Sequence, residues 1–492
     1  MIKNDNVNTF KAEPWFWLFL SIHVLAWTLA PALIRKNLPL DSIEGTLWGQ
    51  QWQLGYDKNP FLNGWLTAIA GNLSHPSGWM IYLFSQLSVG LCFWAVWRLG
   101  KAMMPAAYAL VGVVLLEAVQ YYNFHAIDFN DNTLELSTWG LATYAFYLAL
   151  KSGRIKHWVM WAVFAALGMM AKYYTLVLLA SMGLLLLLHP AHRKQLATTA
   201  PYIGVFVFAA LCAPHVWWLF HHDFITVRYV FERADAVPHW SNHFVFPLKF
   251  IWQQVEVFLP ALFIYGLLFL GKRPCREKLM IARDDRLFLW VLGLGPIVLT
   301  ALLSLVCGTM LRAGWGMPLQ SLWPLVLLSV LAPRLSRFKL ISFMCGLFLL
   351  IAAAVVFYRD SLVHSPDASS ANFPGQTMAT LLTEEWHTAF HQPLVYVAGS
   401  RWIGGNIEYY SSDHPNVFVE WDITRAPWIN LNDLNKKGAI FVWDVTGGET
   451  LPPDVRKTYP RLRPSFILEF QLRRNEYHLP PQKVGVAILP PE

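Results

Sequence analysis

The chain has 492 residues, of which 55% are hydrophobic and 14% are charged, and its mean hydropathy is +0.38. Soluble domains carry about 25% charged and roughly 45–50% apolar residues, so both values indicate a lipid environment and exclude disordered, collagen-like and disulfide-scaffold proteins. The formal net charge of +7 would also fit nucleic-acid binding, but most Lys and Arg residues lie in short loops between apolar runs. We therefore expect a membrane protein that binds no nucleic acid.

Apolar runs close to the length of a membrane-spanning helix, about 20 residues, recur through the first three quarters of the chain. The runs at 157–171 and 173–188 are short and separated only by Lys172, so they also fit one broken element. The pattern predicts an α-helical polytopic membrane domain over residues 1–357. Eleven membrane-spanning helices are expected, at 15–34, 79–97, 104–122, 134–150, 157–171, 173–188, 201–219, 248–270, 287–307, 317–333 and 339–357.

The distribution of basic residues predicts the orientation. With the N-terminus in the cytoplasm, the inner loops hold 16 Lys and Arg residues and the longer outer loops hold 7. Cytoplasmic loops of membrane proteins are enriched in these residues, so a cytoplasmic N-terminus is favoured. An odd number of spans then places the C-terminal segment outside.

The composition changes at about residue 358, after which no long apolar run occurs. Short strand-like segments at 394–398, 417–419, 439–443 and 465–470 are separated by turn signals such as Gly447-Gly448, and 377–390 has a helical pattern. Residues 358–492 are therefore expected to form a small soluble α/β domain on the outer face.

The first outer loop, residues 35–78, contains apolar residues at helical spacing: Ile43, Leu47, Trp48 and Trp52. This spacing predicts an amphipathic helix that lies in the membrane–water interface.

Three charged residues of this loop are candidates for chemistry. Asp41 and Glu44 stand at the start of the predicted helix, where a carboxylate can deprotonate an acceptor hydroxyl or amine. Lys58 can pair with a phosphate as a point charge. Two structural alternatives stay open: Asp41-x-x-Glu44 has the spacing of a helix capping box, and Lys58 also fits a lysine that contacts solvent or lipid headgroups.

The second outer loop holds two Asp residues and a His but no Lys or Arg. Asp128 and Asp131 would suit a divalent cation such as Mg²⁺ or Mn²⁺, which prefers oxygen ligands, or would orient a sugar. The alternative is that Asp131 or Asn132 caps the next helix, with Glu135 in its first turn.

Three further outer positions carry candidate ligands. His221, followed by His222 and Asp223, is a possible metal ligand, although an interfacial loop is the alternative. Arg312 is one of few outward cations and would hold a lipid phosphate or simply anchor the interface. Lys172 is either a phosphate contact or a lysine that extends along apolar surface to water.

Other motifs are missing from the sequence. No Gly-x-x-x-x-Gly-Lys-Ser/Thr loop is present, which argues against an ATP-driven pump, and neither GxSxG nor HExxH occurs. The predicted spans carry few central charges, Glu117 and Glu256 being exceptions, which argues against a proton-relay transporter.

The order of several motifs resembles a known family. The segment "GYDKNPFLNGWL" resembles a block of the bacterial dolichyl-phosphate-mannose–protein mannosyltransferase superfamily, which includes aminoarabinose-transferase-like enzymes and has the GT-C fold. "FNDNT", "GMMAKYYTLVLL", "HVWWLFHHDF" and "RAGWGMP" resemble later blocks in the same order. Two positions depart from the usual text, because Asn59 replaces a His and Phe61 replaces a Pro. The matching residues of the first block are Gly55, Tyr56, Lys58, Pro60, Leu62 and Trp65.

The resemblance implies an inverting transfer of a hexosyl or pentosyl group from a polyprenyl-phosphate donor, at the outer face of a bacterial inner membrane. The acceptor would be lipid A or lipopolysaccharide, another envelope glycan, or a protein. By this similarity Asp41 is the base or the carboxylate that orients the acceptor, and Glu44 supports it, although the spacing leaves open which of the two acts. The other implied roles are donor phosphate binding by Lys58, Lys172 and Arg312, and sugar or acceptor binding by Tyr56, Asp128, Asn130 and Asp131.

Two alternative functions make different predictions from those of an enzyme. A transporter or flippase of lipid-linked sugars predicts polar groups deep in several spans, whereas this chain concentrates them in outer loops. A structural partner in envelope assembly predicts that Asp41 is dispensable. The enzyme hypothesis requires Asp41, Lys58 and Arg312 to converge on one cavity at the outer leaflet.

Overall fold

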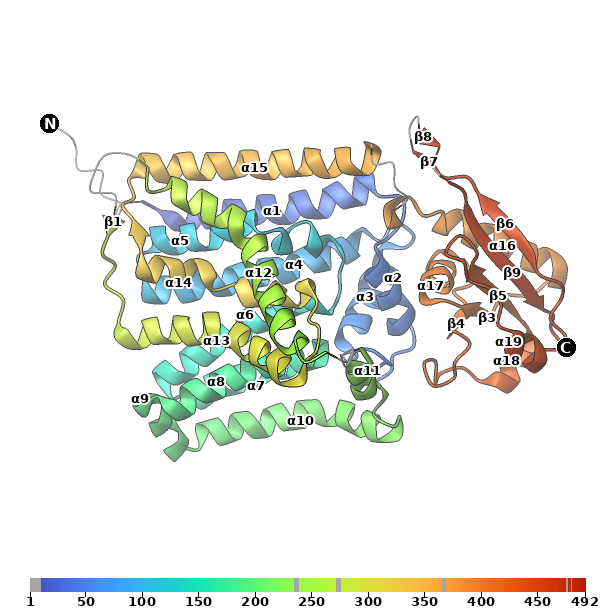
Figure 1. Ribbon diagram of the computed structural model, residues 1–492, viewed down its shortest axis with the longest axis horizontal. Helices are drawn as coiled ribbons and strands as arrows, with labels where there is room; N and C mark the ends of the chain where they lie inside the picture. The colour runs from blue at the N-terminus through green and yellow to red at the C-terminus, as the bar shows by residue number, and fades with distance from the viewer. Residues whose placement is uncertain (1–9, 234–238, 271–275, 365–368, 475–476, 479) are drawn as a thin grey trace.

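Figure 1 shows a computed structural model of the chain, which describes residues 10–233, 239–270, 276–364, 369–474, 477–478 and 480–492. A bundle of roughly parallel helices makes up the first part, and a mixed α/β part follows the last bundle helix and lies against one end of the bundle. The predicted fold class, a helical membrane protein with a small α/β region near the C-terminus, is confirmed.

Six helices of the described chain are long and apolar enough to cross a membrane, and up to eight spans result when each of two bent helix pairs counts as one. The bent pairs join Ala106–Ala118 to Gln120–Ile127 and Thr175–Leu188 to Pro190–Ala197. The six long helices are α1 (Ala12–Ile34), α4 (Trp79–Met103), α10 (Ala200–His221), α12 (Asn242–Leu267), α13 (Arg283–Cys307) and α15 (Arg337–His364).

Helical structure occurs in all eleven predicted ranges, but five of them do not form one long apolar helix. When each bent pair counts as one span, three such ranges remain: 134–150, 157–171 and 317–333. The range 134–150 falls in α6 (Asp131–Ser152), which packs between α4 and α7 (Ile155–Ala171) and is shielded from lipid along most of its length. A shielded helix tolerates polar residues that a lipid-facing helix does not. The range 317–333 divides into a 3-10 helix, η6 (Ala313–Gln320), and α14 (Trp323–Val330).

The helical structure is interrupted at Lys172, which separates two helices. Lys172 has an extended backbone, with φ −162° and ψ 139°, and follows the last residue of α7. The next helix, α8 (Thr175–Leu188), begins three residues later. The remaining short helices of this part are α5 (Ala106–Val114), η2 (Leu115–Ala118), η3 (Gln120–Tyr122), η4 (His125–Ile127), α9 (Pro190–Arg193), η5 (Lys194–Ala197) and α11 (Ile225–Arg233).

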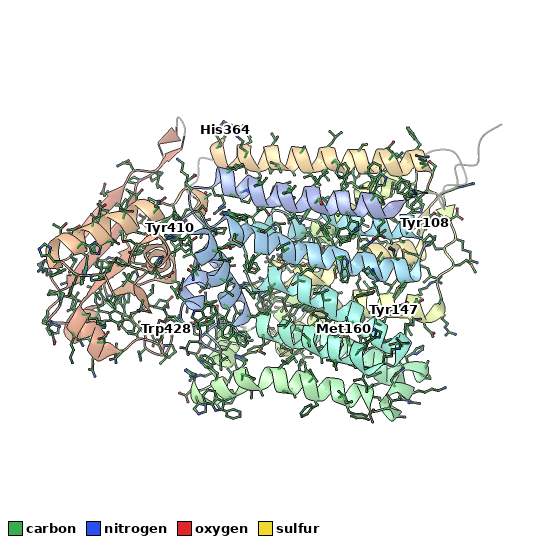
Figure 2. All side chains as sticks on the ribbon, turned by 180° about the vertical axis from the view of Figure 1, so that it is seen from behind. Tyr108, Tyr147, Met160, His364, Tyr410 and Trp428 are labelled. Atoms are coloured by element: carbon green, nitrogen blue, oxygen red, sulfur yellow. The ribbon has the colours of Figure 1, made fainter. Side chains whose placement is uncertain are left out.

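The bundle has two chemically different ends. Figure 2 shows Tyr410 and Trp428 where the α/β part meets the bundle, and Tyr108 and Tyr147 at the opposite end. The predicted outer loops lie at the end that carries the α/β part; for example, the Leu38 backbone N–H donates to the Tyr410 hydroxyl at 3.1 Å. Of the basic residues counted for the inner loops, Lys272 and Arg273 lie outside the described residues.

The C-terminal part contains a five-stranded mixed sheet in the order β4-β3-β5-β9-β6. Strand β3 pairs in parallel with β4 and β5, and β9 pairs antiparallel with β5 and β6. All four predicted strands are observed, and the sequence pattern missed β9. The strands are β3 (Tyr396–Gly399), β4 (Asn416–Val419), β5 (Ala439–Asp444), β6 (Phe466–Phe470) and β9 (Gln482–Leu489).

The remaining elements of the described chain are four α-helices, one 3-10 helix and two small strand pairs. Helix α16 (Gly375–Phe390) confirms the predicted helix, and α17 (Arg401–Tyr410) faces the bundle. The proposed domain boundary at 357/358 falls inside α15, which continues to His364. The other elements are η7 (Ser370–Asn372), α18 (Leu431–Lys437), α19 (Pro453–Thr458), β1 (Arg276–Glu277), β2 (Ala332–Pro333), β7 (Arg473–Arg474) and β8 (Tyr477–His478).

The first outer loop folds into two helices, α2 (Leu40–Gly49) and α3 (Leu62–Ser74), and α2 packs between α3 and α17. Ile43, Leu47 and Trp48 are buried by protein, and Gly405 of α17 lies so close that an added Cβ would stand 2.7 Å from the Ile43 side chain. The prediction that this apolar face lies in the membrane interface is therefore wrong. The α/β part covers the face instead.

Candidate functional site

The start of α2 is held by a carboxylate from another loop. Asp128 accepts hydrogen bonds from the backbone N–H groups of Asp41 (3.1 Å) and Ser42 (2.9 Å) and from the Ser42 hydroxyl (2.8 Å). The first-turn N–H groups of a helix lack intrahelical partners and attract negative charge, so Asp128 satisfies and stabilises this end. The capping residue of α2 is Pro39, and Asp41 lies in the first turn. The capping-box interpretation of Asp41 and Glu44 is therefore wrong.

Asp41 is half-buried, and its side chain accepts a hydrogen bond from Asn130 Nδ2 at 2.8 Å. None of the ion pairs in the described part of the chain involves Asp41. Burial raises the pKa of Asp41, and the negative charges of Glu44 and Asp131 raise it further, against the hydrogen bond from Asn130 and the charge of Lys58. A carboxyl group in this setting holds a proton more readily than an exposed Asp, which suits a general base.

Asn130 also caps the next helix of the bundle. Its Oδ1 accepts from the Thr133 backbone N–H at 3.1 Å at the start of α6. The alternative that Asp131 or Asn132 caps this helix is therefore wrong, because the capping position belongs to Asn130. One amide side chain thus fixes both the start of α6 and the carboxylate of Asp41.

Glu44 lies one helical turn after Asp41 but in a different electrostatic environment. Its Oε1 is 2.5 Å from Lys58 Nζ and 3.2 Å from Arg401 Nε. Burial raises the pKa of Glu44, and the two cations act against this shift. Arg401 also forms an ion pair with Asp57, the residue before Lys58. The sequence analysis missed Asp57 and Arg401; the adjacency of Asp57 and Lys58 was the available signal for the first.

A tight hairpin positions Lys58. Gly55 and Pro60 pair as an antiparallel bridge, and the Tyr56 backbone N–H donates to the Asn59 carbonyl at 3.0 Å. The Tyr56 ring stacks on Trp48 with ring centroids 5.4 Å apart and is buried. The buried ring of Tyr56 therefore anchors the hairpin on Trp48 of α2.

A second cation, Lys172, pairs with the residue that follows Asn130. Lys172 Nζ is 2.7 Å from Asp131 Oδ2 and donates to Asn132 Oδ1 at 2.5 Å. It also lies over the ring of Trp315, 5.5 Å from the ring centroid. The side chain of Lys172 is 14% exposed, so it is held in a protein environment.

Arg312 is the least integrated of the predicted site residues. It is exposed and stands at the start of η6, where its carbonyl accepts from the Trp315 backbone N–H at 3.1 Å. Trp315 is also the residue whose ring lies under Lys172, so it connects the two cations. Arg312 forms no ion pair with the partner of Lys58, Glu44, in the described structure. Asp41 is thus connected to the Lys172 group through Asn130, which precedes Asp131 in the chain, and to the Lys58 group through α2, which also carries Glu44. Arg312 lies on a neighbouring loop.

The candidate metal ligands serve other purposes. Asp128 caps α2 and Asp131 pairs with Lys172, while His221 Nδ1 is 2.8 Å from the Trp217 carbonyl of its own helix. Within the described ranges, no group of three or more His, Cys, Asp or Glu residues is arranged to hold a metal ion. Asp128, Asp131 and His221 therefore do not form a common ligand set here.

Hydrogen bonds from α10 support the same loop. His215 of α10 has its Nδ1 2.7 Å from the Leu54 carbonyl and its Nε2 2.5 Å from the Tyr173 hydroxyl. Trp218 Nε1 donates to Gln53 Oε1 at 3.3 Å. The "HVWW" segment thus links the Lys58 hairpin to the residues next to Lys172.

Comparison with known proteins was made by sequence and by structure. A family model described as dolichyl-phosphate-mannose-protein mannosyltransferase matches residues 58–218, which include Lys58, Asp128 and Lys172. The lipid A galacturonosyltransferase RgtD of Rhizobium johnstonii is 22% identical over 252 residues, covering 49% of this chain and 52% of RgtD. The chain therefore spans about half the length of this curated relative.

Solved structures share the architecture over nearly the whole chain. ArnT from Cupriavidus metallidurans, bound to undecaprenyl phosphate, superposes with a TM-score of 0.61 at 13% identity, covering 96% of this chain and 98% of ArnT. The arabinofuranosyltransferase AftD from Mycobacteria gives a TM-score of 0.54 at 14% identity, over 99% of this chain and 40% of AftD. At these identities the likeness shows the fold alone.

Proposed function

We propose that this chain, a membrane glycosyltransferase of the GT-C superfamily, transfers a sugar from a polyprenyl-phosphate donor to a glycolipid acceptor of the lipid A type. The relative RgtD is named for lipid A, and ArnT was solved with undecaprenyl phosphate, so both ends of the reaction have a counterpart among the similar proteins. The observation that carries the proposal is Asp41, a half-buried carboxylate without an ion partner in the described structure. It lies on the same helix as Glu44, the partner of Lys58, and is held by Asn130, the residue before the Lys172 partner Asp131.

Asp41 is assigned as the general base. Glu44, its neighbour on α2, already faces two cations, whereas Asp41 accepts one hydrogen bond from Asn130. In the transfer step Asp41 takes the proton of an acceptor hydroxyl, and the oxygen bonds to the anomeric carbon of the sugar. The bond from that carbon to the phosphate oxygen breaks, and its electron pair leaves with the phosphate. Attack opposite the leaving group inverts the anomeric configuration.

Lys58 and Lys172 are assigned to the donor phosphate, with Arg312 at the edge of the site. Negative charge grows on the phosphate as its bond to the sugar breaks, and positioned cations stabilise that charge most in a water-poor site. Asp128 and Asn130 hold α2 and Asp41 in place, and Asp131 orients Lys172. The phosphoester of the donor supplies the driving force, which agrees with the lack of an ATP-binding loop in the sequence.

We propose a bacterial inner membrane location with a cytoplasmic N-terminus and the site at the periplasmic face. The loops with 16 basic residues then face the cytoplasm, and the α/β part, which follows α15, faces the periplasm with the site. A lipid-linked donor and a glycolipid acceptor would both reach the site from the outer leaflet.

The test uses full-length protein in lipid nanodiscs, a radiolabelled polyprenyl-phosphate sugar and lipid A. Wild-type protein is expected to label the glycolipid, and Asp41→Asn is expected to fold normally and label it at a background rate. Lys101→Ala, at the opposite end of the bundle, is the matched control and should retain transfer. Full transfer by Asp41→Asn would remove the site assignment. No transfer by the wild type with any of a panel of polyprenyl-phosphate sugars would remove the function.

A further inference from the structure

One arginine of the α/β part reaches into the charged cluster of the bundle. Arg401 is the first residue of α17, which Ser400 caps by accepting from the Ile403 backbone N–H at 3.3 Å. Its guanidinium forms an ion pair with Asp57 and lies 3.2 Å from Glu44. The side chain is 12% exposed, so this contact is buried where the two parts of the chain meet.

Four charges balance one another at this contact. Lys58 and Arg401 are the cations, and Glu44 and Asp57 are the anions. Glu44 Oε1 is shared, because Lys58 Nζ lies 2.5 Å away on one side and Arg401 Nε 3.2 Å away on the other. Glu420 approaches Arg401 more loosely, at 3.8 Å, and is itself half exposed.

The second cation at Glu44 becomes important when Lys58 binds a phosphate. The ammonium group must then turn toward the phosphate and loosen its ion pair with Glu44. A buried carboxylate left without a cation is strongly unfavourable, so the loss of this pair would oppose donor binding. Arg401 is already within ion-pair distance of the same carboxylate oxygen and can keep it compensated.

We propose that Arg401 is a positioning residue that keeps Glu44 paired while Lys58 binds the donor phosphate, so that the α/β part completes the donor site. This inference rests on the proposed function, since it takes the ligand of Lys58 to be a polyprenyl phosphate. Arg401 acts through Glu44 and Asp57 and touches no reacting atom. It explains why the α/β part is packed directly on α2.

The proposal separates binding from chemistry. Without Arg401, Glu44 holds Lys58 as its single cation, and the donor must compete with that ion pair. The affinity for the donor and its KM should therefore change more than kcat. The loss of donor affinity without Arg401 should depend on the charge of Glu44. A neutral side chain at position 44 has no negative charge for Arg401 to balance.

The experiment measures binding of undecaprenyl phosphate to the full-length protein in nanodiscs. Arg401→Gln is expected to weaken binding about tenfold, and Arg401→Lys, which retains one charge, by a smaller factor. In a Glu44→Gln background, Arg401→Gln should weaken binding by about threefold or less. Arg456→Gln is the matched control, since Arg456 is an exposed arginine of the same part that donates to Ser465 at 2.9 Å; it should bind as the wild type does.

Two results would overturn the inference. One is wild-type affinity in Arg401→Gln; the other is the same loss from Arg401→Gln with and without the Glu44 charge, which would indicate a purely structural role. If Arg401→Gln does not fold, Arg401→Lys carries the test, and wild-type affinity and KM in that variant would overturn it. If the wild type binds no undecaprenyl phosphate, the proposed function fails; binding that is indifferent to Arg401 leaves that function intact.

Discussion

The two ends of the helical bundle handle charge in different ways. At the end that meets the α/β part, the cations of the ion pairs are enclosed: the side chains of Lys58, Lys172 and Arg401 are 20%, 14% and 12% exposed. At the opposite end, Lys101 and Lys151 pair with acidic residues but are 33% and 42% exposed. The paired cations are therefore buried at the end that meets the α/β part and exposed at the opposite end.

The difference indicates where the protein does its chemistry. Exposed pairs contribute little to stability, and basic residues at a membrane edge set orientation. Buried pairs carry a desolvation cost, which a hydrophobic replacement would avoid, so we propose that their concentration at the end that meets the α/β part marks the functional site. Asp41 lies at this end, on the same helix as Glu44.

The largest expected effect is the loss of the base. Asp41→Asn keeps an oxygen for the hydrogen bond from Asn130 but removes the proton acceptor, so kcat should fall by about a thousandfold. Transfer of a radiolabelled sugar, measured at saturating donor and acceptor, checks this. A fall of less than tenfold in properly folded protein would show that Asp41 is not the base.

The next effect tests the buried cations against the exposed ones. Lys58→Ala should lower kcat/KM for the donor by about a hundredfold, since it removes a phosphate contact and leaves Glu44 with Arg401 alone. Steady-state kinetics with varied donor concentration measures the change. A donor KM and kcat equal to those of the wild type would contradict the phosphate role of Lys58.

The pH profile gives a third test, in which the sign follows from the raised pKa of Asp41. The base works when deprotonated, so kcat/KM should fall as the pH drops through a value above the ordinary Asp pKa of about 3.9. Asp131→Asn removes one nearby negative charge and frees Lys172, and both changes should lower the apparent pKa. Asp454→Asn, on the exposed surface, is the control. An unshifted acidic limb in Asp131→Asn would contradict the assignment.

A smaller effect on stability is expected from the capping carboxylate. Asp128→Ala removes the acceptor of three hydrogen bonds at the start of α2 and should lower the free energy of unfolding by about 1–2 kcal/mol. Ser42→Ala, which removes one of the three, should cost less. Denaturant titration of the detergent-solubilised protein measures both, and unchanged stability in Asp128→Ala would contradict the capping role.

The smallest effect is expected at the opposite end. Lys101→Ala breaks an exposed ion pair with Glu13, so both transfer rate and donor affinity should stay within about twofold of the wild type. A loss comparable to that of Lys58→Ala would remove the distinction between the two ends.

Much of the fold follows from local sequence pattern. Apolar length predicted helical structure in all eleven ranges, and short strand-like segments between turn signals predicted four strands. The count of long spans was less reliable because α6 packs between α4 and α7, where neighbouring helices rather than its own apolar length shield it. Strand β9 was missed because small residues, Gly485 and Ala487, stand between Val484, Val486 and Ile488, so polar alternation is weak there.

The sequence suggested candidate residues for the site but not the contacts that these residues make. Charge type and loop position indicated Asp41, Lys58 and Lys172. The partner of each depends on contacts across the fold: Asp128 reaches the start of α2 from 86 and 87 positions away, and Arg401 reaches Asp57 across 344 positions. For the same reason the apolar face of α2 was assigned to lipid, although α17 covers it. Spacing within a segment carries no information on such partners.

The most direct test of the central claim is a cryo-electron-microscopy structure of the full-length protein in nanodiscs with undecaprenyl phosphate. The account predicts phosphate density in contact with Lys58 or Lys172 beside Asp41, at the end of the bundle that the α/β part covers. Phosphate density at the Lys101 end, or density at the α/β end that contacts neither lysine, would contradict it.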